Sequence, residues 1–323
     1  MRPTTSFICF IVSMIALSNV SFGQESTAAT ASSIILKQAQ YFADVHSVEY
    51  TIQSGDEKKG DFFSKVLWKE MGNKYLFDYH LINRPNRQEE KVLVSYDGEH
   101  AFDYGQADDV MFIQKAPMSQ FNPMISDTVD DGPFFAFRFL APRKKRGGIG
   151  EMYSESTLKS VAERATLEPG KNRTWGGHPC LAVKISDAYD RTSHKAVDYV
   201  VYFATDCALF PIAWEMFSKD GHLDTTFRVK QFKTIPMAGG GEHLSFRYPE
   251  VAYVRSIPIV ERFVAKGVPP PVDDETFTEG LDGILSFPDL KINHLQQSDF
   301  TLDPSMARHI NDLDSKIDIA VPK

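Results

Sequence analysis

The sequence predicts a mainly β (α+β) fold, an antiparallel sheet accompanied by few helices. From residue 48 to residue 254, apolar residues recur mostly at every second position, which is the period of a strand with one buried face. Turn signals separate these runs, most clearly Asp-Gly at 97–98 and 220–221. Parallel strands need long, usually helical crossovers, so this alternation of strands and short turns favours antiparallel pairing.

The first 23 residues have the composition of a secretory signal peptide. Arg2 precedes an apolar run from Phe7 to Leu17, and small residues follow at Ser21 and Gly23. The apolar run is about half of the ~20 residues that a membrane-spanning helix needs, which favours a signal peptide over a membrane anchor. We therefore expect cleavage after Gly23 and a periplasmic or secreted protein that does not span the membrane.

The mature chain is acidic and keeps two cysteines. Loss of Arg2 moves the formal net charge from -8 to -9, which argues against non-specific binding of nucleic acid. Cys9 leaves with the signal peptide, so Cys180 and Cys207 remain as an even pair in an oxidising compartment. We expect a disulfide between them, worth about 3.5 kcal/mol in the chain-entropy picture. Two buried free thiols are the alternative.

One helix and a series of strands are expected in the first third of the chain. Residues 32–48 predict an amphipathic helix, because Ile35 and Phe42 recur along one side and Ser32 or Ser33 can cap its start. Period-two runs then predict strands at 48–53, 62–70, 73–80, 91–96 and 99–104.

Prolines interrupt residues 116–150, which we interpret as a loop with a short helix. Strand patterns return at 175–185, 196–204, 207–232 and 242–254. Within 207–232 a two-residue type I′ turn at Asp220-Gly221 would set Trp214 opposite Phe227, Ile212 opposite Val229 and Met216 opposite Thr225.

The last part of the chain carries a weaker pattern. The stretch VPPPVDDE is extended and stiff, and is typical of a linker or a strap across the surface. After it we expect a strand near Phe300, a short helix from about Pro304 and a terminal strand at 317–321.

Motifs for catalysis, cofactors and metals are missing. The sequence lacks G-x-S-x-G, H-E-x-x-H, C-x-x-C, the P-loop and G-x-G-x-x-G, and its nine histidines show no metal-ligand spacing. Asp312, Asp314 and Asp318 resemble part of a calcium loop but lack its central glycine. We therefore predict no catalytic residues, no metal site and no cofactor. A hydrolase with dispersed residues would need a convergent acid, base and nucleophile, which the sequence does not supply.

Large apolar side chains on one side of the strands are the remaining candidates for function. They can form a plain core, or they can line a cavity in a curved sheet that is only partly filled. In the second case each buried methylene contributes about 0.8 kcal/mol, so a chain of about a dozen carbons gives on the order of 10 kcal/mol before ordering costs. The candidate cavity residues are Tyr50, Trp68, Tyr75, Phe77, Tyr79, Tyr96, Ile212, Trp214, Met216, Phe227 and Val229.

The order of these features resembles the LolA/LolB-like superfamily of periplasmic lipoprotein carriers. The resemblance is carried by the N-terminal helix and meander and by YDGEHAFDY, GGHPCLAVKIS and LFPIAWEMFSKDGHLDTTFRVKQF. It implies an unclosed antiparallel β-barrel whose concave side is plugged by helices and a loop, with a cavity for acyl chains. It divides the chain into a signal peptide (1–23), a LolA-like half-barrel (32–260), and a proline-rich strap with a C-terminal extension packed on the same domain (261–323).

Two functions follow as hypotheses. The first is a non-enzymatic periplasmic carrier or sensor that binds lipid or lipoprotein acyl chains in the apolar cavity. The alternative is an envelope protein-interaction module with a solid core and no ligand, whose strap and acidic surface bind a protein partner.

Overall fold

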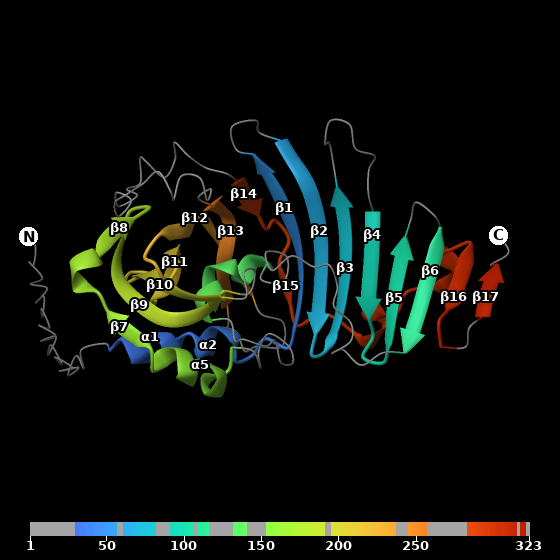
Figure 1. Ribbon diagram of the computed structural model, residues 1–323, viewed down its shortest axis with the longest axis horizontal. Coiled ribbons are helices and arrows are strands. Elements are labelled where there is room, and N and C mark those ends of the chain that lie inside the picture. Colours follow the sequence, from blue (N-terminus) through green and yellow to red (C-terminus); the bar gives the residue numbers. More distant parts are fainter. Residues whose placement is uncertain are drawn as a thin grey trace, which may run out of the picture.

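One open sheet dominates the computed structural model (Figure 1). Seventeen strands belong to it, and among the described residues no pairing joins its two ends into a barrel. The predicted mainly β, unclosed architecture is therefore confirmed. No helix in the described part of the chain is long and apolar enough to cross a membrane. The structure describes residues 30–56, 61–81, 91–105, 109–115, 132–140, 153–190, 195–236, 245–256, 283–314 and 317–320. The predicted signal peptide and the VPPPVDDE stretch lie outside these ranges.

The elements keep one numbering along the chain. The helices are α1 (Ala31–Lys37), α2 (Ala39–Phe42) and α5 (Glu155–Ala162), with 3-10 helices η1 (Gly132–Leu140), η2 (Pro169–Lys171), η3 (Gln297–Phe300) and η4 (Pro304–Met306). The strands are β1 (Ser47–Asp56), β2 (Asp61–Met71), β3 (Lys74–Leu81), β4 (Lys91–Tyr96), β5 (His100–Gly105), β6 (Val110–Lys115), β7 (Ala165–Leu167), β8 (Arg173–Trp175), β9 (His178–Asp190), β10 (Lys195–Ala204), β11 (Phe210–Phe217), β12 (Leu223–Pro236), β13 (Ser245–Ser256), β14 (Gly283–Ser286), β15 (Lys291–Ile292), β16 (His309–Asp312) and β17 (Ile317–Ala320).

The strands form two antiparallel meanders, which are joined by a strand from near the C-terminal end of the chain. Strands β9 to β13 pair in sequence order, and so do β1 to β6. The short strand β14 lies between β13 and β1 and is antiparallel to both, so it connects the two halves. Within the ranges that the structure describes, every strand pairing is antiparallel except the one between β6 and β16. The sheet curls tightly at its β9–β12 end and opens toward β6 (Figure 1).

The β11–β12 hairpin has the predicted register over most of its length. Trp214 lies opposite Phe227, and Met216 lies opposite Thr225. A bulge after Met216 then shifts the pairing by one residue, so that Phe217 lies opposite Leu223.

The turn of this hairpin differs from the prediction. The Gly221 N–H donates to the Ser218 carbonyl at 2.9 Å, and the Ser218 N–H donates to the His222 carbonyl at 2.9 Å. Gly221 has φ +85°, whereas Asp220 has no positive φ. The loop therefore has three residues, 219–221. It consists of a turn over 218–221 whose last residue is a left-handed glycine, and it is not the predicted two-residue type I′ turn. An Asp-Gly pair suits both turns, so the local signal could not distinguish them.

The helices cover one face of the sheet, which we call the inner face. Thr30 caps α1, its Oγ1 accepting from the Ser33 N–H at 3.1 Å, rather than Ser32 or Ser33 as predicted. Phe134 of η1 contacts the ring of Tyr50 on β1, and Phe139 contacts Phe203 on β10. The short helix predicted in the proline-interrupted region is thus η1, and it packs against β1, β9 and β11–β13.

The C-terminal segment packs on the opposite, outer face of β2–β6. Phe300 of η3 is fully buried in a separate apolar cluster with Leu76, Phe102 and Met111. The predicted strand at Phe300 is therefore wrong, because this residue ends a 3-10 turn. The predicted helix near Pro304 and the terminal strand at Ile317 are present as η4 and β17.

Candidate functional site

The eleven predicted cavity residues lie together on the inner face. Ten of them are buried members of one apolar core. The eleventh, Tyr79, is half-buried and packs against that core. Strand register links the two halves of the set. Val229 lies opposite Ala252, Ala252 opposite Leu285, and Leu285 opposite Ser54, which shares its side of β1 with Tyr50.

A row of directly opposed residues crosses β1 to β6 on this face. Tyr50 pairs with Trp68, Trp68 with Phe77, and Phe77 with Val94; the row continues through the exposed Asp103 to Phe112 on β6. The exposed fraction rises along it from 0% at Tyr50 through 7% at Phe77 to 41% at Phe112. The apolar surface therefore runs from under the helices to solvent.

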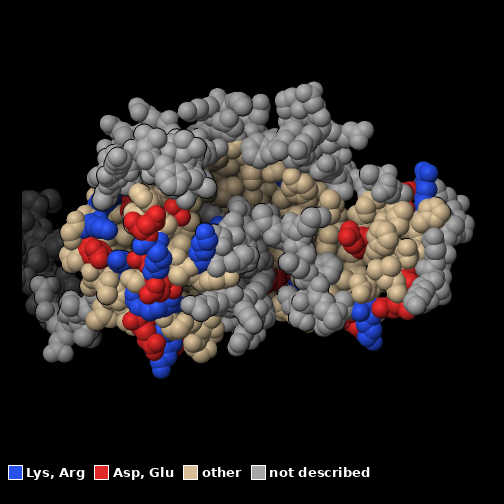
Figure 2. All heavy atoms as spheres, viewed as in Figure 1, with Lys and Arg blue, Asp and Glu red and all other residues tan. Residues whose placement is uncertain are grey.

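Aromatic rings of the row stack on neighbouring rings of the same face. Trp68 stacks on Tyr75 with centroids 5.6 Å apart, and Phe77 stacks on Tyr79 at 6.0 Å. One buried carboxylate interrupts the apolar surface, since the Trp68 indole N–H donates to Oε2 of Glu70 at 3.2 Å. In Figure 2 the hollow over the upper ends of β14, β1 and β2 has a floor of mostly uncharged residues, whereas charged side chains gather over α5, β7 and β9.

Charged and aromatic side chains form a different cluster on the outer face of β8–β12. The Tyr202 hydroxyl donates to Oε2 of Glu215 at 2.9 Å, and Nη1 of Arg173 lies 3.7 Å from Oε1 of the same carboxylate. The Arg173 guanidinium also lies 4.8 Å from the ring centre of Tyr202. Burial raises the pKa of Glu215, while Arg173 and the Tyr202 hydrogen bond lower it. Burial and the adjacent carboxylate raise the pKa of Tyr202.

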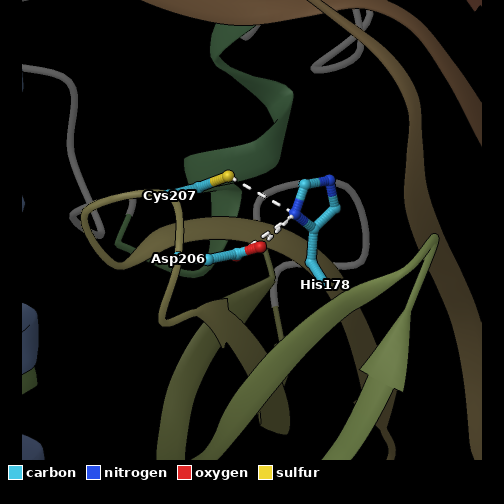
Figure 3. A group of neighbouring side chains, drawn as sticks. All are labelled: His178, Asp206 and Cys207. Atoms are coloured by element: carbon cyan, nitrogen blue, oxygen red, sulfur yellow. Dashed lines mark hydrogen bonds and ion pairs between the residues drawn. The ribbon is translucent and has the colours of Figure 1, made fainter.

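Three side chains of metal-ligating type meet where β9 begins and β10 ends (Figure 3). His178 Nδ1 lies 2.9 Å from Oδ2 of Asp206 and 3.1 Å from its Oδ1, and Sγ of Cys207 lies 3.4 Å from the same nitrogen. The hydrogen bond to His178 lowers the pKa of Asp206. Burial and the Asp206 carboxylate raise the pKa of the Cys207 thiol, against the effect of Arg247.

The two cysteines flank this histidine. Cys180 Sγ donates to the His178 carbonyl at 3.2 Å, while Cys207 approaches the ring. Both are free thiols in this structure. The predicted disulfide is therefore not formed here. Of the alternative, two buried free thiols, only Cys180 is buried, because Cys207 is half-buried.

Strand register explains why no local motif indicated this cluster. Cys180 lies opposite Ala204 on β10, and continuing the same register by two residues sets His178 opposite Asp206. The Thr205 N–H bonds the Pro179 carbonyl at 2.9 Å and holds that continuation. The three residues converge because two strands pair, so spacing rules that operate within one helix or loop could not find them.

Comparisons with known proteins return structural similarities only. No family model matches the chain, and no curated protein matches it. A LolA superfamily protein from Nitrosomonas europaea is similar to it at 14% identity and a TM-score of 0.38, over 85% of this chain and 99% of that one. A putative outer membrane lipoprotein-sorting protein domain from Vibrio parahaemolyticus has 13% identity and a TM-score of 0.41, over 83% and 94%.

A DUF1329 family protein from Desulfovibrio piger has 10% identity and a TM-score of 0.40, with the same two coverages as the Vibrio domain.

Proposed function

We propose that this protein is an exported, non-enzymatic carrier or sensor of lipid or lipoprotein acyl chains, which it binds on the inner face of β2–β6. The supporting observation is the row of opposed residues from Tyr50 to Phe112, in which Asp103 is the one charged member. The exposed fraction of these side chains rises with distance from the helices. A surface that is apolar, aromatic and open at one end fits a flexible hydrocarbon, and each methylene that it buries contributes about 0.8 kcal/mol.

The two halves of the inner face have different roles in this proposal. Under η1 the rings are packed against one another, as where Trp214 stacks on Phe227 at 5.5 Å and meets the edge of Tyr199 at 5.4 Å. That packing supports the alternative of a solid core for the β9–β13 half. The predicted residues Ile212, Trp214, Met216, Phe227 and Val229 then stabilise the fold. The acyl chain contacts the open end of the inner face, at the half-buried Tyr79 and Val92 and the exposed Phe112.

A matched pair of substitutions on one strand tests the location. Val92 and Leu93 are neighbours on β4 and are both half-buried. Val92 lies opposite Tyr79 on the inner face, whereas Leu93 packs on the apolar cluster around Phe300 on the opposite face. The purified mature protein is titrated with a dansylated fatty acid, and energy transfer from tryptophan to dansyl is followed. Val92→Lys should weaken binding at least about tenfold, because it places a charge in the apolar site. Leu93→Lys should leave binding unchanged.

Tryptophan variants refine the same experiment. Trp68 lies on the inner face beside the proposed site, with its ring against that of Phe77, whereas Trp175 lies with Arg173 and Tyr202 in the charged and aromatic cluster on the outer face of β8–β12. Trp68→Phe should remove most of the energy transfer, and Trp175→Phe should remove little. A wild-type protein that binds no fatty acid, or a Leu93→Lys effect equal to that of Val92→Lys, would contradict the proposal and favour the protein-interaction module.

A further inference from the structure

His178, Asp206 and Cys207, which meet where β9 begins and β10 ends, do not belong to the apolar site. Their geometry is unusual for three side chains that only hydrogen-bond to one another. Both the Asp206 carboxylate and the Cys207 sulfur approach His178 through the same ring nitrogen, Nδ1 (Figure 3). A cysteine nucleophile activated by a histidine and a carboxylate needs these partners at opposite nitrogens, so that one positions the ring and the other gives up its proton. The arrangement is therefore not that of a catalytic triad.

The three donor atoms lie within 4.8 Å of one another, close enough to share a metal ion. In tetrahedral zinc sites Zn–N distances are about 2.0 Å and Zn–S distances about 2.3 Å, which separates the nitrogen and sulfur by roughly 3.5 Å. The observed distance between Nδ1 and Sγ is 3.4 Å. The oxygen lies 2.9 Å from Nδ1, a few tenths of an ångström closer than in a tetrahedral site, and Asp206 is exposed enough to move by that amount.

The loop that carries two of the three donors is held in a strained conformation. Ala208 and Leu209, directly after Cys207, have φ of 53° and 61°, a region that costs a non-glycine residue on the order of 1 kcal/mol or more. The N-terminal helices fix these residues. The Tyr41 hydroxyl donates to the Ala208 carbonyl at 3.1 Å, and Nε2 of Gln38 donates to the Leu209 carbonyl at 3.2 Å.

The charges of the cluster balance those of a divalent cation. A thiolate at Cys207 and a carboxylate at Asp206 together neutralise a dication, so the neighbouring Arg247 would face a site without net charge. Nitrogen, oxygen and sulfur donors together favour Zn²⁺ over Mg²⁺ or Ca²⁺, which prefer oxygen alone.

We propose that His178, Asp206 and Cys207 bind one Zn²⁺ ion through Nδ1, a carboxylate oxygen and Sγ, with the fourth position open to water or to a donor from a partner. This site is separate from the acyl-binding surface and does not depend on it. Although the sequence predicts no metal site, the pairing of β9 with β10 assembles one.

Metal binding to the reduced, metal-free mature chain tests the proposal directly. Equilibrium dialysis followed by elemental analysis should find one Zn²⁺ per chain. Co²⁺ in its place should give the thiolate-to-metal charge-transfer absorption of a cysteine-ligated ion. Cys207→Ser should abolish that absorption, and His178→Ala should weaken Zn²⁺ binding at least about tenfold, since outer-shell changes alone cost 10- to 100-fold.

Cys180 provides the matched control, because its sulfur faces the His178 carbonyl and not the cluster. Cys180→Ser should keep the stoichiometry and the absorption. Bound Zn²⁺ should also protect Cys207, and not Cys180, from alkylation in the wild-type chain. Far-UV circular dichroism confirms that each variant is folded. A wild-type chain without stoichiometric Zn²⁺, or Zn²⁺ binding that Cys207→Ser and His178→Ala leave unchanged, would overturn the proposal.

Discussion

Removing the guanidinium beside Glu215 tests the electrostatics of the outer-face cluster. Glu215 keeps 8% of its side chain exposed and Arg173 keeps 25%, with 3.7 Å between Nη1 and Oε1. Breaking a fully buried pair by removing one partner costs 3–5 kcal/mol, because the other charge is left in a poorly solvated site. Arg173 is partly solvated and the Tyr202 hydrogen bond to Glu215 remains, so we expect Arg173→Met to cost about 3 kcal/mol at pH 7.

The loss should depend on pH with a definite sign. Burial already raises the pKa of Glu215 above its ordinary value, and Arg173 is the largest influence that lowers it. In Arg173→Met the pKa of this carboxyl rises further. A carboxyl with a raised folded-state pKa binds its proton more tightly in the folded protein than in the unfolded chain. The protein therefore loses stability as the pH rises from the unfolded-state pKa of this carboxyl through its folded-state pKa. The cost of the substitution should therefore shrink at pH 4 to 5.

Urea unfolding followed by tryptophan fluorescence measures these changes. Glu215→Gln in the Arg173→Met background removes the buried charge and should restore at least half of the lost stability at pH 7. Lys171→Met is the matched control: this exposed cation lies near the same carboxylate and should cost less than about 0.5 kcal/mol. A loss below 1 kcal/mol for Arg173→Met, or one that is the same at pH 4.5 and pH 7, would refute this reasoning.

Two further predictions concern the C-terminal segment, and the same urea titration checks both. Phe300→Ala should cost about 3–5 kcal/mol, as for other buried phenylalanines, while the exposed Leu313→Ala should cost under about 0.5 kcal/mol; equal effects would mean that the segment does not support the outer face. Asn293→Ala should cost about 2 kcal/mol, because its amide accepts from the His46 N–H at 2.7 Å and donates to the Asp44 carbonyl at 2.6 Å; an unchanged midpoint would show that these bonds contribute nothing.

The fold was predictable where one face of a strand is buried. Trp214, Phe227 and Met216 are found in the predicted register, because slipping a strand by one residue would move every apolar side chain to the opposite face. The turn between these strands was not predictable, since Gly221 provides its positive φ to a three-residue loop as readily as to a two-residue one.

Short strands that join distant segments gave no usable signal. β14 has four residues and β15 has two, too few for a period to appear. Their places in the sheet depend on edges that β1 and β13 offer, as where Leu285 pairs with Ser54 on one side and Ala252 on the other. Tertiary pairing therefore decided what local propensity could not.

Hydrogen bonds between the N-terminal helices and the 205–209 loop explain why the two halves of the inner face differ. Lifting α2 from the sheet would break the bonds from Tyr41 to Ala208 and from Gln38 to Leu209, each worth about 0.5–1.5 kcal/mol, and would expose the fully buried Phe42. Burial of one such ring is worth about 1.5–3 kcal/mol. A guest hydrocarbon that enters under α2 must offset all of these terms together. At the open end of the inner face, on β3 to β6, it need not disturb these contacts, which is why the acyl chain is assigned to the half-buried Tyr79 and Val92 and the exposed Phe112.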